Sequence, residues 1–195
     1  GAWAAEKISL QRRVDALKIF QKQYPNVEIW LTLPVLPSGL TDGKAVVNQM
    51  VAAGVKVAGV NIMAMDYGAG AEKPAGKSMG FYAIEAAKSL HQQLKDIYQS
   101  NNVAKTDAQL WKMIGVTPMI GLNDVTTETF YLKDAQAVVD FAKQKQMPFV
   151  GMWSMNRDHA CNDKYVSNKC SSLPKPPNAP SGDYLFSAVF NQLEQ

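Results

Sequence analysis

The sequence lacks several features that would assign it to a broad functional class. Its two histidines and two cysteines, in 195 residues, do not form the clustered ligands that a metal site needs. A net charge of +3, without a run of Lys and Arg, indicates neither nucleic acid nor an anionic membrane as a partner. No apolar stretch approaches the roughly 20 residues of a membrane span. We therefore expect no metal, no cofactor, no nucleic acid and no membrane.

The two cysteines, Cys161 and Cys170, lie in the polar stretch "HACNDKYVSNKCSS". No spacing typical of a zinc site accompanies them. A disulfide between them would close a loop of about ten residues, which stabilises by ~2–3 kcal/mol in the chain-entropy picture. We expect this disulfide, and with it an oxidising compartment. Two reduced thiols are the alternative.

Helix and strand patterns alternate along the chain, which contains 47% hydrophobic residues. Continuous apolar runs predict buried strands at 27–34, 60–66, 111–121 and 147–155. Helical patterns lie within 9–25, 40–54, 78–100, 122–146 and 182–195. Ser9 and Thr41 are the expected caps of the first two helices. Such an alternation predicts parallel βα units joined by right-handed crossovers.

Two α/β architectures fit this order, a small open doubly wound sheet and part of a (β/α)8 barrel. The loops after the strands are long and chemically loaded, whereas "QYPN" and "QKQMP" before the strands are short. This asymmetry is typical of a barrel with its active face at the carboxyl ends of the strands. Neither G-x-G-x-x-G nor G-x-x-x-x-G-K occurs, although an open sheet would more often carry a nucleotide loop. We therefore interpret residues 1–195 as one partial barrel domain.

The predicted strand ends carry methionine, aromatic, carboxyl and amide side chains. The set comprises Met63, Met65, Asp66, Tyr67, Met119, Asn123, Asp124, Trp153 and Asn156. Apolar sugar faces stack on Trp, and hydroxyl and acetamido groups need fixed polar partners, so this combination favours sugar recognition.

Each of these residues also has a purely structural interpretation. Trp153 and the methionines would fill a core, and Asp124 would cap a helix or form an Asx-turn. Asp158 would form a solvated ion pair with Arg157. We expect His91 on a solvated helix face, and His159 has no recognisable triad partners.

Four motifs, taken together, resemble a known family. "LTLPVLPSGLT", "VNIMAMDYG", "GVTPMIGLND" and "FVGMWSMNRD" resemble the fifth to eighth strands of glycoside hydrolase family 18, in a bacterial chitinase branch. The resemblance implies the C-terminal half, strands 5–8, of a secreted or periplasmic (β/α)8 barrel. Such an enzyme hydrolyses β-1,4 bonds between N-acetylglucosamine units by a retaining, substrate-assisted mechanism, an exception to two-carboxylate chemistry.

The resemblance also implies roles for individual residues. Trp153 matches the tryptophan that floors the subsite of the distorted sugar. Met63 and Met65, with Asp66 and Tyr67 as supporting catalytic groups, match the surroundings of the acetamido group, to which Tyr67 would supply the phenol. Met119 and Asn123 correspond to residues near the same pocket.

The family's D-x-x-D-x-D-x-E motif, whose glutamate is the catalytic acid, does not occur in this sequence. In the branch resembled, a stretch like the opening "GAW" follows that glutamate, so the acid would lie just before residue 1. We therefore expect this chain alone to be inactive, because a general acid contributes about 10²–10⁴-fold. The implied partners are chitin or chitooligosaccharides, and either the N-terminal half of the barrel or a second copy of the chain. The alternative function is a non-catalytic, chitinase-like carbohydrate-binding or self-assembling module.

Overall fold

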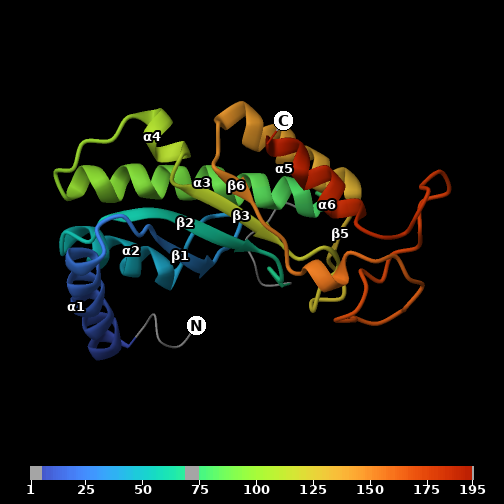
Figure 1. Cartoon of the computed structure of the whole chain (residues 1–195), viewed down its shortest axis with the longest axis horizontal. Coiled ribbons are helices and arrows are strands. Elements are labelled where there is room, and N and C mark those ends of the chain that lie inside the picture. Colours follow the sequence, from blue (N-terminus) through green and yellow to red (C-terminus); the bar gives the residue numbers. More distant parts are fainter. Residues whose placement is uncertain (1–5, 69–74, 195) are drawn as a thin grey trace.

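A parallel sheet of four strands, in the order β1-β2-β3-β6, organises the chain (Figure 1). This computed structural model describes residues 6–68 and 75–194. The strands are β1 Ile29–Pro34, β2 Val57–Ala64, β3 Ile114–Pro118 and β6 Phe149–Val150. Their order in space repeats their order in the chain, as expected when each crossover joins neighbouring strands. The predicted parallel βα architecture is confirmed. The "GAW" stretch and part of the loop after Asp66, at 69–74, lie outside the described residues.

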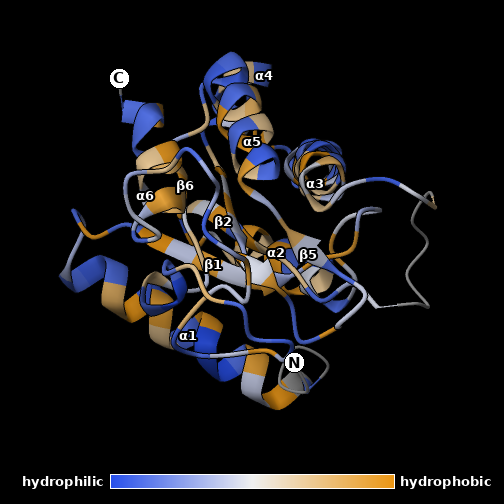
Figure 2. Cartoon of the chain, turned by 90° about the vertical axis from the view of Figure 1, so that its right-hand side faces the viewer, coloured by the Kyte–Doolittle hydropathy of each residue, from blue (hydrophilic) through white to orange (hydrophobic). Residues whose placement is uncertain are grey.

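Helices connect the strands and pack on one another in chain order. They are α1 Lys7–Gln23, α2 Asp42–Ala52, α3 Met79–Ser100, α4 Asp107–Trp111, α5 Leu132–Lys145 and α6 Leu185–Phe190. Successive packing pairs are α1 with α2, α2 with α3, α3 with α5, and α5 with α6. Figure 1 shows α3 along the sheet with α5 near it, and Figure 2 shows polar and apolar residues interleaved around α3. None of the described helices is long and apolar enough to cross a membrane.

Two short elements were not expected from the sequence. A small antiparallel hairpin, β4 Gly121–Leu122 with β5 Thr129–Phe130, follows β3. Helix α4 includes Trp111, which the sequence assigned to the third strand. The capping box of Thr106 and Gln109 stabilises the start of α4, and this local signal is stronger than the apolar run that suggested a strand.

Several predicted boundaries are also corrected. Glu6 caps α1 instead of Ser9, because its carboxylate accepts hydrogen bonds from the backbone N–H groups of Ile8 and Ser9. Thr41 stands before α2 but makes no side-chain cap bond. Strand β2 ends at Ala64 rather than Asp66, whose φ of 50° places it in the left-handed region.

The two faces of the sheet differ in how far they are covered. Alternate residues of β2 that face the helices, Val60, Ile62 and Ala64, are fully buried in the main hydrophobic core. The residues between them and their neighbours on the other strands form what we call the open face. It consists of Trp30, Thr32, Asn61, Met63, Thr117 and Phe149, all at least partly exposed.

The open face is ordered although it is uncovered. The rings of Trp30 and Phe149 meet edge to face with centroids 5.0 Å apart. They lie flat on the sheet because Gly59 and Gly115 beneath them have no Cβ, which would sit 2.2 Å and 2.4 Å from ring atoms.

A polar row lies on the same face. The Thr117 hydroxyl donates to Asn61 Oδ1 at 2.9 Å, and Asn61 Nδ2 donates to Thr32 Oγ1 at 3.4 Å. The open face therefore pairs an aromatic patch with satisfied polar groups.

His91 is not the solvated residue that its helix pattern suggested. Its ring stacks on Trp111 at 4.2 Å, and its Nε2 lies 3.1 Å from Asp107 Oδ1. The unpredicted helix α4 covers His91, which is why the pattern of α3 alone gave the wrong environment.

Candidate functional site

Trp153 lies just beyond the carboxyl end of β6, with 58% of its surface exposed. Its backbone continues the pairing with the neighbouring strand, because its N–H donates to Pro118 O at 2.8 Å and its carbonyl accepts from Ile120 N at 3.0 Å. A cis peptide bond joins it to Ser154. The interpretation of Trp153 as a core residue is therefore wrong, because a fixed backbone presents its ring to solvent.

A groove of about 790 Å³ opens beside Trp153. Asp124, Ser154, Asn156 and the segment 165–169 line it, and Met119 contributes to the same lining. Asp124 is exposed there, and no helix begins at it. The groove thus offers an aromatic surface together with hydroxyl, amide and carboxylate groups, the combination that sugar recognition requires.

The predicted residues Asp66 and Asn123 meet at the carboxyl end of β2. Asn123 Oδ1 accepts from Asp66 N at 3.4 Å, and its Nδ2 donates to the carbonyls of Met119 and Gly121, both at 3.0 Å. The Asp66 carboxylate accepts from Val125 N at 3.0 Å. These bonds fix the end of β2 to the segment that follows β3.

Glu128 is a buried part of this junction that the sequence analysis missed. Its carboxylate accepts hydrogen bonds from Tyr67 N at 2.9 Å and Gly68 N at 3.0 Å. A lone glutamate in "TTETF" gives no pattern that would reveal this role. The junction was visible only once the hairpin brought Glu128 under the end of β2.

The four other predicted residues of this region differ in their environment. Tyr67 is buried, its ring lies edge-on to Tyr82 at 5.9 Å, and its hydroxyl is also buried. Burial raises the pKa of the Tyr67 phenol, and the charge of Glu128 raises it further. Met119 is buried at the groove, whereas Met63 and Met65 are half-buried.

Arg157 and Asp158 are both buried and have separate partners. Arg157 donates to the carbonyls of Ile120 at 3.0 Å and Leu122 at 2.6 Å, and also to Ser167 O. Burial lowers the pKa of its guanidinium, and the nearby Asp124 and Asp66 oppose that shift.

The Asp158 carboxylate accepts from the backbone N–H groups of Phe186 and Ser187 at the start of α6. The expectation of a solvated Arg157–Asp158 ion pair is therefore wrong. These neighbours anchor the chain after Trp153 in two directions, one toward the β4 hairpin and one toward α6.

The predicted disulfide between Cys161 and Cys170 is present. Within residues 6–68 and 75–194, these cysteines and Asp163 form the one cluster of potential metal ligands. The disulfide uses both sulfurs, so the cluster offers no thiolate to a metal.

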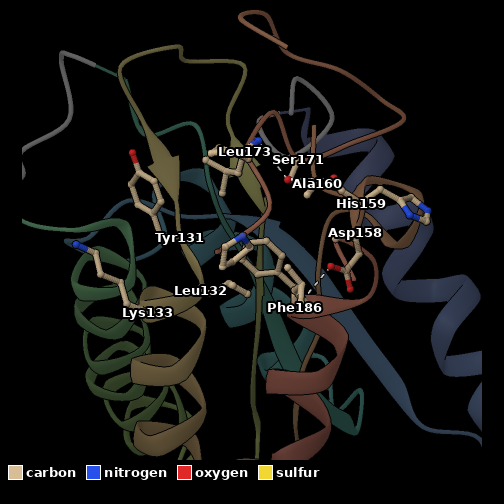
Figure 3. A pocket seen from close by; sticks show the side chains of 13 residues that line it. Tyr131, Leu132, Lys133, Asp158, His159, Ala160, Ser171, Leu173 and Phe186 are labelled. Carbon is tan, nitrogen blue, oxygen red and sulfur yellow. Dashed lines mark hydrogen bonds between the residues drawn. The ribbon is translucent and has the colours of Figure 1, made fainter. Parts of the chain in front are cut away.

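A second hollow, of about 260 Å³, lies between the starts of α5 and α6 and the loop that follows Trp153 (Figure 3). Leu132, Leu173 and Phe186 contribute apolar side chains to it. Lys133 and His159 point away from its centre (Figure 3). His159 Nδ1 instead lies 2.8 Å from Asp183 Oδ1. Because its lining is mostly apolar, this hollow suits a sugar less than the groove beside Trp153 does.

Comparison with known proteins finds similarity to chitinases. The sequence is 41% identical over 199 residues to a probable bifunctional chitinase/lysozyme of Escherichia coli, covering 97% of this chain and 21% of that protein. The structure superposes on the catalytic domain of a hyperthermophilic chitinase from Pyrococcus furiosus with a TM-score of 0.80 and 37% identity. The chain is chitinase-like and resembles part of a family 18 catalytic domain.

Further matches define how much of these proteins the chitinase-like chain spans. Endochitinase 11 of Metarhizium anisopliae is 41% identical over 167 residues, which are 81% of this chain and 31% of that protein. The Pyrococcus match covers 93% of this chain and 55% of the other. The chain thus spans about a fifth to a third of the curated relatives. No protein-family model matches the sequence.

Proposed function

We propose that the chitinase-like chain forms the sugar-platform side of an active site that hydrolyses β-1,4 bonds between N-acetylglucosamine units. The observation that carries the proposal is the exposed Trp153 ring, held at the carboxyl end of the sheet beside a polar groove. An apolar sugar face would stack on this ring while the groove holds the hydroxyl groups. The chitinases to which the chain is similar support this substrate class.

The proposed reaction is retaining and assisted by the substrate. A carboxylic acid protonates the leaving oxygen, and the acetamido carbonyl oxygen attacks the anomeric carbon as the glycosidic bond breaks. Water then opens the resulting oxazolinium ion and restores the acetamido group. In this scheme, Trp153 floors the reacting sugar, and Asp66, fixed by Val125 and Asn123, stabilises the acetamido side.

We further propose that the acid comes from outside this sequence, which contains no D-x-x-D-x-D-x-E motif. The chain would then bind chitooligosaccharides but not cleave them. The N-terminal half of a barrel, placed against the open face, would supply both the acid and the missing pocket wall. We also infer an extracellular or periplasmic location, which the disulfide supports.

Calorimetric titration of the chain with chitotetraose tests the platform. Trp153→Ala should weaken binding about tenfold or more, because stacking and apolar burial are both lost, whereas Trp153→Phe should retain part of the affinity. Circular dichroism of each variant controls for folding. Absence of binding by the unmodified chain would overturn the proposal.

Release of nitrophenol from a chitobioside tests the missing acid. The chain alone should release none. Mixing it with the N-terminal part of the Pyrococcus furiosus catalytic domain should produce activity if the halves assemble. Hydrolysis by the chain alone would contradict the proposed origin of the acid.

A self-assembling, non-catalytic module is a second candidate, supported by the open face. Trp30 and Phe149 form a partly exposed aromatic patch there, and such patches on soluble proteins commonly mark interfaces. Within the described residues, β1 and β6 also pair with one strand each, so both edges are available to a second copy. Native mass spectrometry that shows a stable dimer would favour this candidate.

A further inference from the structure

Tyr165 and Trp153 line the same groove, although the loop that carries Tyr165 played no part in the sequence-based prediction of the site. The Tyr165 side chain is 66% exposed. We propose that the loop closed by the Cys161–Cys170 disulfide forms a second sugar subsite beside Trp153, in which Tyr165 stacks on a further N-acetylglucosamine unit. This inference rests on the proposed function.

The disulfide and hydrogen bonds fix the backbone that carries Tyr165. The disulfide joins residues on both sides of it, and the Tyr165 carbonyl accepts from the Ser172 hydroxyl at 2.7 Å. The N–H of Cys161 donates to Leu173 O at 2.8 Å, which closes the base of the loop. An exposed tyrosine on a mobile loop would lose conformational entropy when it binds a ligand. Because the backbone at Tyr165 is already fixed, this loss is smaller here.

The loop is also tied directly to the segment that follows Trp153. Ser154 Oγ donates to Asn156 Oδ1 at 2.6 Å, and Asn156 Nδ2 donates to the carbonyl of Asn168 at 2.5 Å. The buried Arg157 donates to Ser167 O from the other side. Two independent contacts therefore hold the loop in place relative to the Trp153 ring.

The chemistry of this wall suits a sugar more than a peptide or a nucleic acid. Tyr165 offers an aromatic face, while Asn168 and Lys169 are exposed polar groups on the same wall. Asp124 also lines the groove and adds a carboxylate, so the groove carries charges of both signs instead of one strong field. A chain of N-acetylglucosamine units presents apolar ring faces and hydroxyl groups in alternation, which matches an aromatic surface flanked by polar groups.

The test compares short and long ligands on the full 195-residue chain. Affinities for chitobiose and chitohexaose are measured by calorimetry with the unmodified protein, Tyr165→Ala, Tyr165→Phe and Tyr24→Ala. Tyr24 is a matched control, because it is an exposed tyrosine at the end of α1, before the amino end of β1. We expect Tyr165→Ala to weaken chitohexaose binding about 3- to 10-fold and to leave chitobiose unchanged. Tyr165→Phe and Tyr24→Ala should bind both ligands normally.

Reduction of the disulfide gives an independent measurement. Treatment with a reducing agent should weaken chitohexaose binding by the unmodified chain and add little to the loss in Tyr165→Ala, because both changes remove the same contact. Independent, additive losses would contradict the proposed link between the disulfide and Tyr165.

The outcomes separate this inference from the proposed function. If Trp153→Ala weakens binding of both ligands but Tyr165→Ala weakens neither, the second subsite is overturned and the platform stands. An equal loss for both ligands in Tyr165→Ala would also overturn a separate subsite. If the unmodified chain binds neither ligand, both proposals fail.

Discussion

The two faces of the sheet differ in how far other parts of the chain cover them. Ile62 faces the helices and is fully buried, whereas Met63, the next residue along β2, lies half-exposed on the open face. Helices and core side chains cover the first face, but on the second face Trp30 and Phe149 protect the sheet only locally. The side chains of the open face are as ordered as those of a protein interior, with close-packed rings and satisfied hydrogen bonds. Within the described residues, however, this face is not covered by helices.

This contrast bears on where a site can form. The covered face provides stability, and the carboxyl edge of the sheet presents Trp153, Asp66 and the groove to solvent. A partner that closes the open face would add a wall to that edge without disturbing the core.

Neighbouring substitutions on β2 test the two faces directly. Ile62→Ala should lower the free energy of unfolding by about 2–5 kcal/mol, because it leaves a cavity in a packed core. Met63→Ala should cost less than about 1 kcal/mol, because its side chain is already partly in water. Urea unfolding measures both. Equal losses would mean that the open face is covered in solution.

Asp158 tests how firmly the chain after Trp153 is attached to the covered side. Asp158→Ala should lower the free energy of unfolding by about 1–3 kcal/mol, because it leaves the N–H groups of Phe186 and Ser187 without their buried acceptor. The exposed Asp96, bonded to Gln92 on α3, is the control, and Asp96→Ala should stay within about 0.5 kcal/mol. Thermal unfolding compares them, and similar small effects would count against the anchor.

A charge on the open face tests whether that face associates. Thr32→Lys should change the free energy of unfolding by no more than about 0.5 kcal/mol, because Thr32 is exposed. It should nevertheless weaken pairing with a second copy or with an N-terminal half, since a lysine would be buried without a partner. Sedimentation at several protein concentrations gives the result. Unchanged association would place the interface elsewhere.

The smallest expected effect is at His159 and Asp183, away from both faces. The hydrogen bond from His159 holds the pKa of the Asp183 carboxyl below its ordinary value of 3.8. A lowered pKa stabilises the fold above that ordinary value, and this contribution is lost as the pH falls through the folded pKa. In His159→Ala, the Asp183 pKa followed by NMR should rise toward 3.8. An unchanged pKa would mean that the bond is not formed in solution.

The sequence pattern was most informative where the structure of an element depends on its own residues. Apolar runs located β1, β2 and β3, and the strand-end positions of Asp66 and Trp153 suggested a site at the carboxyl edge. The pattern failed where a segment distant in the sequence determines the environment of a residue. Trp111 and His91 cover each other across two helices, and Glu128 reaches the end of β2 only through the hairpin.

The site shows the same division. A tryptophan at position 153 suggested a surface for sugar stacking, but the sequence could not say whether its ring faces a core or solvent. The sequence by itself determined the alternation of strands and helices, because this depends on local periodicity. It also predicted the disulfide from two cysteines that lie close together in the chain, and the structure confirms that bond.

Only the tertiary structure decided that Tyr67 is buried and that Arg157 and Asp158 bind different partners. It also decided that Tyr165 lines the same groove as Trp153. These outcomes depend on which surfaces meet when distant segments pack. The free energy of such contacts cannot be read from residues that are adjacent in the sequence.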